Sequence, residues 1–208
     1  MVEASLSSLA CSTCAMMRAV LKQIIGRTYL RAFGWREMGE KPEPAAYVLI
    51  AAPHTSNWDL PFMLAISYVH DVPIQWAGKH TLFRFPFGGV MKALGGIAIE
   101  RSKRHNRVKQ LASLFETRPG LVLTMPAEGT RSYRDHWKSG FYHIAREAGV
   151  PIVCGYLDFD KKEGGFGLTL YPTGDVKADM DQIRAFYGDI QGKFPEKFGP
   201  VRLREEAS

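Results

Sequence analysis

The chain has 208 residues, enough to bury a substantial core in one domain, and this length does not require a second domain. Hydrophobic residues make up 46% of it and charged residues 23%, which excludes a disordered or fibrous chain. The formal charge of +6 favours anionic partners, such as phosphorylated small molecules, acidic carrier proteins, anionic lipids or nucleic acid.

The cysteine content argues against a disulfide framework. The chain has an odd number of cysteines, namely Cys11, Cys14 and Cys154, and the first two lie close to the N-terminus. This usage predicts a reducing compartment. Cys11 and Cys14 have the spacing of half a zinc site, but no second pair completes four ligands, so we expect no metal.

The N-terminal segment predicts a loose tail over residues 1–13 and then a basic amphipathic helix. Its apolar residues recur at helical spacing: Met17, Val20, Leu21, Ile24 and Ile25. This face either lies in a membrane interface, with Tyr29, Phe33 and Trp35 as anchors, or packs on the protein's own core. The two prolines within 40–44 indicate a linker. We therefore expect a tail, helix and linker over residues 1–44 and one domain over 45–208.

Charged side chains interrupt the apolar window that comes closest to the length of a membrane span. The first residues also lack the order of charge and apolar core that a secretory signal has. From this we expect a cytoplasmic protein.

After the linker, short β-like segments alternate with helical ones. The expected strands are 47–52, 73–76, 96–99, 121–124, 152–157 and 168–171. The expected helices are 60–69, 87–94, 104–116, 140–148 and 177–187. This alternation predicts an α/β fold: a single domain with a largely parallel mixed sheet flanked by helices and preceded by the N-terminal helix. In such folds the functional site lies at the carboxyl ends of the strands.

The first polar cluster at such a strand end is "PHTSNWD", residues 53–59. His54 and Asp59 are five positions apart, so on one helix they would face different directions. Pro61 is tolerated in a first helical turn, which places the helix start near Trp58 or Asp59, with Ser56 or Asn57 available as the N-cap. Asp59 can then fold back to one ring nitrogen of His54 and leave the other as a base. The same pattern also fits a purely structural alternative, in which His54 is a turn residue and Asp59 only caps the helix.

Two further clusters follow later strands. Arg101, in "GGIAIERS", has the bidentate donors that phosphate binding uses, although a solvated start of a helix would look the same. In "PAEGTRS", Gly129 permits a tight turn, Glu128 can bind hydroxyl groups and Arg131 can support a carboxylate or a phosphate. Basic residues exceed acidic ones strongly between residues 79 and 109, which indicates a surface that faces an anion, a membrane or a carrier protein.

In order and spacing, HTSNWD, GGIAIERS, PAEGTRS and GVPIV resemble the four sequence blocks of the glycerolipid acyltransferase superfamily, the PlsC-like lysophosphatidic acid acyltransferases. The resemblance covers most of the chain after residue 45. It implies that His54 is a general base, that Asp59 orients it, and that Arg101 binds the phosphate of the acceptor. It also implies a set of acceptor-binding residues, namely Glu128, Gly129, Thr130 and Arg131. Pro53 and Ala127 depart from the usual family residues, and both fall in the wall of the acceptor pocket.

The resemblance implies an O-acyltransferase that moves a fatty acyl group from acyl-CoA or acyl carrier protein to a hydroxyl of a lysophospholipid-like acceptor, such as 1-acylglycerol 3-phosphate. It implies no metal or redox cofactor, a peripheral association with an anionic cytoplasmic membrane surface, and no binding to nucleic acid. The sequence leaves three roles open for a group of phenylalanines: contact with the membrane, the wall of an acyl tunnel, or part of the core. These residues are Phe83, Phe85 and Phe87. Two alternatives stay open: an acyl thioesterase or lipid hydrolase, and a non-catalytic lipid module that binds membranes.

Overall fold

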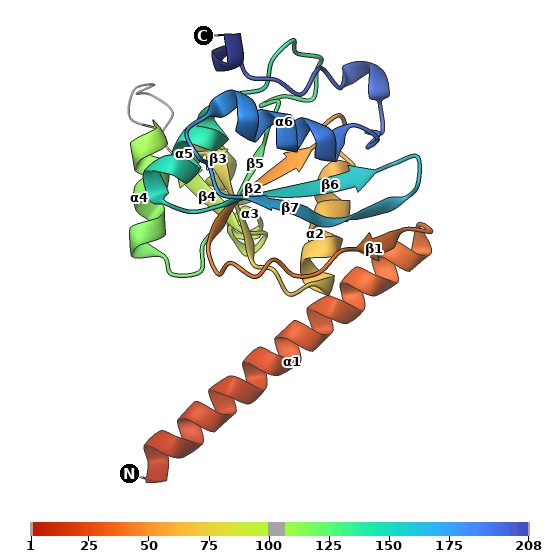
Figure 1. Ribbon diagram of the computed structural model, residues 1–208. Helices are drawn as coiled ribbons and strands as arrows, with labels where there is room; N and C mark the ends of the chain where they lie inside the picture. Colours follow the sequence, from red (N-terminus) through yellow and green to blue (C-terminus); the bar gives the residue numbers. More distant parts are fainter. Residues whose placement is uncertain (1, 100–106, 208) are drawn as a thin grey trace.

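The computed structural model describes residues 2–99 and 107–207. Within these residues, seven strands form one mixed sheet with helices on both faces (Figure 1). The strands are β1 (Arg36–Met38), β2 (Tyr47–Ala52), β3 (Ile74–Lys79), β4 (Gly96–Ile99), β5 (Val122–Pro126), β6 (Ile152–Asp158) and β7 (Glu163–Leu170). The α-helices are α1 (Val2–Ala32), α2 (Asp59–Val69), α3 (Gly88–Ala93), α4 (Arg107–Thr117), α5 (Gly140–Ala148) and α6 (Val176–Tyr187). Short 3-10 helices are η1 (His80–Phe83), η3 (Pro195–Lys197) and η4 (Arg204–Ala207).

The strand order is β1-β7-β6-β2-β5-β3-β4. The five strands from β6 to β4 in this order run parallel to one another, and β7 pairs antiparallel with β6. This confirms the predicted α/β fold with a largely parallel sheet. Because β2 and β5 are parallel neighbours, the loops that follow them leave the same edge of the sheet side by side.

Each face of the sheet has its own hydrophobic core. On one face, α2 and the end of α1 pack Phe62, Ile66 and Leu30 against the strands. On the other face, α4, α5 and α6 contribute Leu111, Phe141 and Met180. The central strand β2 is therefore covered on both sides, which is why its sequence, "YVLIAA", is apolar throughout instead of alternating.

Most predicted elements are present with bounds that differ by a few residues, and β2, β4 and α5 have the predicted bounds. The strand expected at 168–171 is the end of the longer β7. Its first half is glycine-rich because β1 approaches closely: a Cβ on Gly165 would lie 1.9 Å from the carbonyl oxygen of Met38. The first residues of the helix expected at 104–116 lie outside the described residues.

Helix α1 corrects the expectation of a loose tail over residues 1–13, because the chain is helical from Val2. No glycine or proline interrupts the sequence before Gly26, and alanine, leucine and methionine favour the helix. Figure 1 shows α1 extending away from the rest of the molecule toward the N-terminus. The boundary predicted at residues 44 and 45 stays a prediction.

The two parts of α1 have different surroundings. Near its C-terminal end Gly26 lies against α2, where a Cβ would be 2.5 Å from the Ala65 carbonyl oxygen, and Leu30 is fully buried. The predicted apolar stripe is instead exposed: Met17, Val20, Leu21, Ile24 and Ile25. Packing on the protein's own core is therefore wrong for this stripe. Trp35, expected as a membrane anchor, is buried and stacks on Phe62.

Among the described helices, none combines the length and the apolar composition that a bilayer span needs.

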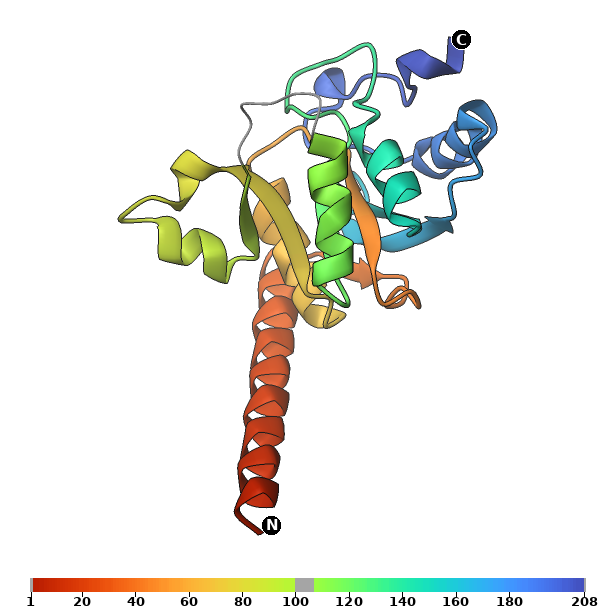
Figure 2. The ribbon, with the colours of Figure 1, turned by 90° about the vertical axis from the view of Figure 1, so that its left-hand side faces the viewer.

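Between β3 and β4 the chain makes an excursion through η1 and α3, which projects from the sheet in Figure 2. Phe83 anchors it: Cβ atoms on Gly78 and Gly96 would lie 3.0 Å and 2.6 Å from the Phe83 ring. Phe85 and Phe87 point outward and are 98% and 67% exposed, so the expectation that they fill the core is wrong.

Candidate active site

The loops after β2 and β5 meet at the carboxyl edge of the sheet. Ala51 of β2 pairs with Pro126 of β5, so the two polar clusters begin side by side. A direct hydrogen bond joins them: the backbone N–H of His54 donates to Glu128 Oε1 at 2.9 Å. Residues that are 74 positions apart in the sequence therefore form one site.

His54 and Asp59 form the contact that their spacing predicts. His54 Nδ1 lies 3.0 Å from Asp59 Oδ2, which also accepts a hydrogen bond from the backbone N–H of Ser56 at 2.9 Å. The Asp59 side chain is 7% exposed and sits at the first residue of α2, where the helix dipole favours a carboxylate. A carboxylate accepts the Nδ1–H of the imidazole, and this leaves Nε2 as the free basic nitrogen.

Ser56 and Asn57 have different roles in the turn. Ser56 Oγ accepts the backbone N–H of Trp58 at 3.1 Å and stabilises the turn before α2. The N-cap of α2 is Trp58, which has no side-chain cap hydrogen bond, so the expectation of Ser56 or Asn57 as the N-cap is wrong. Asn57 Oδ1 accepts a hydrogen bond from Arg131 Nη1, which ties the loop after β2 to the loop after β5 a second time.

Glu128 lies beneath His54 and is only 2% exposed. Its Oε1 accepts the His54 N–H, and its Oε2 is buried with no hydrogen-bond partner among the described residues. Burial raises the pKa of the Glu128 carboxyl above its ordinary value. In this arrangement Glu128 contacts the backbone of His54 from the protein interior, and its predicted contact with the acceptor stays a prediction.

Gly129 and Thr130 form the turn after Glu128. Gly129 has a φ of 69°, a conformation that favours glycine, and a Cβ there would lie 2.9 Å from Lys138 Cγ. Thr130 Oγ1 accepts the backbone N–H of Ser132 at 3.3 Å. These two residues shape the loop that presents Arg131. Arg101, the predicted phosphate ligand, lies outside the described residues.

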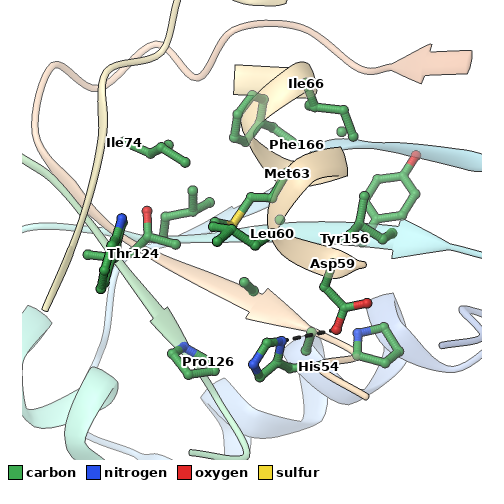
Figure 3. A pocket seen from close by; sticks show the side chains of 18 of the residues that line it. His54, Asp59, Leu60, Met63, Ile66, Ile74, Thr124, Pro126, Tyr156 and Phe166 are labelled. Carbon is green, nitrogen blue, oxygen red and sulfur yellow. Dashed lines mark ion pairs between the residues drawn. The ribbon is translucent and has the colours of Figure 1, made fainter. Parts of the chain in front are cut away.

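A cavity of about 280 Å³ opens beside the His54–Asp59 pair. His54, Asp59 and Pro126 border one end of it, and Met63 lines its wall from α2 (Figure 3). The far end is formed by Ile66, Ile74 and Phe166. The site thus combines a polar end that carries a base with a long apolar interior.

The sequence singled out the polar residues of this cavity but not its apolar lining. Met63, Trp76 and Phe166 come from a helix and two strands whose apolar residues look like ordinary core. Gly155 and Gly165 also line it, and two glycines inside strands are a signal that could have indicated open space or close approach. Phe83, Phe85 and Phe87, considered above as a tunnel wall, are not among its lining residues.

A C-terminal segment that sequence reasoning missed supports the loop after β2. Thr55 Oγ1 accepts the backbone N–H of Phe194 at 3.2 Å, and a Cβ on Gly192 would lie 2.8 Å from that same oxygen. Lys193 Nζ lies 4.9 Å from the centre of the Trp58 ring. The loop that carries His54 is therefore held from both sides, by Glu128 and by residues 192–194.

The structure thus places a histidine–aspartate pair at the end of an apolar cavity, on the polar loops of a mixed α/β sheet. The acyltransferase family model matches residues 35–157, more than half of the chain. The chain belongs to this acyltransferase family, within the PlsC-like superfamily.

Curated relatives match about half of the chain. The 1-acyl-sn-glycerol-3-phosphate acyltransferase of Escherichia coli is 31% identical over 131 residues, which are 58% of this chain and 52% of the relative. The enzyme of that name from Haemophilus influenzae is 35% identical over 107 residues, 48% of this chain and 43% of the relative. The chain spans about half the length of the curated relatives it matches.

Among solved structures, the fold is similar to the crystal structure of the 1-acyl-sn-glycerophosphate (LPA) acyltransferase, PlsC, from Thermotoga maritima. The TM-score is 0.56 and the identity 16%, over 82% of this chain and 75% of that chain. At this identity the similarity shows a shared fold.

Proposed function

We propose that this protein is an O-acyltransferase that moves a fatty acyl group from an acyl thioester, acyl-CoA or acyl carrier protein, to a hydroxyl of a lysophospholipid-like acceptor such as 1-acylglycerol 3-phosphate. One observation carries the proposal: the His54–Asp59 pair, 3.0 Å apart, borders one end of an apolar cavity. The names of the relatives support this choice of acceptor.

His54 Nε2 takes the proton of the acceptor hydroxyl while that oxygen attacks the thioester carbonyl. The new C–O bond gives a tetrahedral intermediate, which collapses as the C–S bond breaks, and the thiolate leaves with the proton that His54 carried. Asp59 holds the Nδ1–H and stabilises the imidazolium that forms in between. Both substrates react directly, so the transfer needs no metal, no redox cofactor and no enzyme nucleophile.

The two ends of the site suit the two parts of the substrates. The apolar cavity between α2 and the sheet fits the hydrocarbon of the acyl thioester, with its carbonyl at His54. Arg131, which also lines the cavity, gives one N–H to Asn57 and has further donors that can bind an acceptor phosphate in two-point fashion. Arg101 is the second proposed phosphate ligand.

The acceptor is a membrane lipid, and we propose that the protein associates peripherally with the cytoplasmic membrane surface. Two exposed apolar surfaces support this: the stripe on α1, and the tip of the β3–β4 excursion formed by Phe85, Phe87 and Val90. Arg84 and Lys92 flank that tip, and they would attract anionic headgroups.

Co-sedimentation with vesicles tests this association. The double variant F85A/F87A is expected to bind anionic vesicles several-fold less tightly, whereas Y171A, which removes an exposed aromatic residue elsewhere, is expected to bind as the wild type does. Equal binding of all three proteins would refute the tip as a membrane contact.

The activity test offers a panel of acyl-CoA and acyl carrier protein donors against lysophosphatidate, other lysophospholipids and lyso-lipids without phosphate, with products identified by mass spectrometry. We expect acyl transfer that depends on the acceptor. R131A and R101A are expected to weaken the use of phosphorylated acceptors far more than that of neutral ones. If free fatty acid is released at the same rate in the presence and in the absence of an acceptor, the protein is a thioesterase instead.

A further inference from the structure

One polar group in the interior of the cavity has no role in the proposed reaction. Thr124 lies in β5 and lines the cavity, although its side chain is almost fully buried, with 3% exposed. Its Oγ1 is buried and has no hydrogen-bond partner among the described residues. The strand neighbours in register are Leu49 on one side and Trp76 on the other.

An unpaired buried hydroxyl is unfavourable because it has lost its water and gained no partner. Packing does not explain why threonine stands here, since valine has the same shape and no hydroxyl. Trp76 does not satisfy it either, because its Nε1–H donates to the Leu94 carbonyl oxygen at 2.9 Å. The hydroxyl therefore suits a partner that arrives with a ligand.

The position of Thr124 in the strand tells which part of a ligand it would meet. Pro126, two residues later in β5, borders the end of the cavity where His54 lies (Figure 3). Thr124 is two residues, or about 6.6 Å, further from that edge. A thioester whose carbonyl is at His54 would pass Thr124 with its hydrocarbon chain. A plain hydrocarbon cannot satisfy a hydroxyl, whereas a chain that carries an oxygen can.

We propose that the Thr124 hydroxyl is a binding point for a hydroxyl group on the acyl chain, so that the cavity selects chains hydroxylated at one position. The inference rests on the proposed function, because it takes the occupant of the cavity to be an acyl chain. A threonine hydroxyl both donates and accepts, so it can pair with a chain hydroxyl in either direction.

The test uses acyl thioesters of one chain length, either unsubstituted or with a single hydroxyl placed at successive carbons, and compares wild type with T124V and T124S. Wild type is expected to use one hydroxylated isomer about 2- to 10-fold better than the unsubstituted donor, the size of one neutral hydrogen bond. T124S keeps this preference and T124V loses it. T117V, which removes an exposed hydroxyl from α4, is the control and keeps it.

The ratio of rates for hydroxylated and unsubstituted donors is the readout, so a general loss of fold or activity in T124V does not imitate the result. An equal ratio in wild type and T124V, with normal acyl transfer, would overturn this inference and leave the proposed function intact. A second arm places the hydroxyl on the acyl chain of the acceptor. If only the hydroxyl on the acceptor's acyl chain gives a preference that depends on Thr124, the result would support the binding point. It would then assign the cavity to the acyl chain of the acceptor. No transfer from any donor would refute the proposed function itself.

Discussion

At the scale of single residues, Glu128 is a buried carboxyl group that holds the backbone of His54 in place by accepting its N–H. Its carboxyl is buried, and burial raises its pKa, so the neutral form is favoured in the folded protein. Its contribution to stability is therefore fully present below the pKa of the unfolded chain. It is lost as the pH rises through the raised pKa of the folded state.

We expect E128Q to remove this pH dependence, because a glutamine keeps an oxygen for the His54 N–H and does not ionise. The free energy of unfolding of the wild type, measured by urea denaturation, should fall relative to that of E128Q across this pH range. Parallel curves for the two proteins would contradict the assignment. E128A should lower acyl transfer more than E128Q does, because it leaves the His54 N–H without a partner.

Gly129 offers a second test at this scale. Its positive φ and the contact with Lys138 predict that G129A destabilises the protein by about 1–2 kcal/mol. Gly140 is the matched control: no atom lies within 4 Å of a Cβ there, and the residue begins α5. G140A should leave the melting temperature unchanged or raise it slightly. A loss of stability in G140A as large as that in G129A would contradict this reading of the loop.

At the scale of elements, α1 has one end that packs and one surface that does not. L30A should destabilise the protein by about 2–5 kcal/mol, because it opens a cavity in the contact with α2. L21A, on the exposed stripe, should leave stability unchanged and weaken binding to anionic vesicles. Denaturation and vesicle co-sedimentation of both variants separate the two surfaces. Loss of stability in L21A would mean that the stripe packs on the protein.

The elements also show what the sequence could and could not reveal. The strands β2 and β4 and the helix α5 were predictable because apolar periodicity and turn residues mark their ends locally. The strand β1 was not, since its three residues are exposed, show no apolar pattern, and are held to β7 by backbone pairing and the Arg36–Glu163 ion pair. Helix α1 was placed too late because the apolar periodicity that indicated it begins only at Met17, whereas the helix begins at Val2.

The candidate site can be divided in the same way, into contacts that local sequence patterns predict and contacts between distant segments that they do not. The His54–Asp59 contact is local, and Pro61 together with the five-residue spacing was enough to predict it. The position of Glu128 beneath His54 depends on the parallel pairing of β2 with β5, which no local pattern encodes. The cavity and the support from residues 192–194 likewise arise from segments far apart in sequence, whose apolar residues resemble ordinary core.

At the scale of the whole molecule, the sheet brings three features to one edge: the His54–Asp59 pair, the Arg131 guanidinium and an apolar cavity. The exposed apolar surfaces lie elsewhere: α1 extends away from the rest of the molecule (Figure 1), and the β3–β4 excursion projects from the sheet (Figure 2). Together these features support the proposed function, in which a lipid acceptor is taken at a membrane surface and an acyl chain enters the cavity.

The central claim is that His54, oriented by Asp59, deprotonates the acceptor. Its most direct test is the steady-state transfer of a labelled acyl group from acyl-CoA to lysophosphatidate by wild type, H54A, D59N and the control H143A, which changes a partly exposed histidine on α5, outside the candidate site. We predict that H54A lowers kcat/KM by about 10²–10⁴-fold, that D59N also lowers it strongly, and that H143A does not. Transfer by a folded H54A protein within a few-fold of wild type would contradict the account.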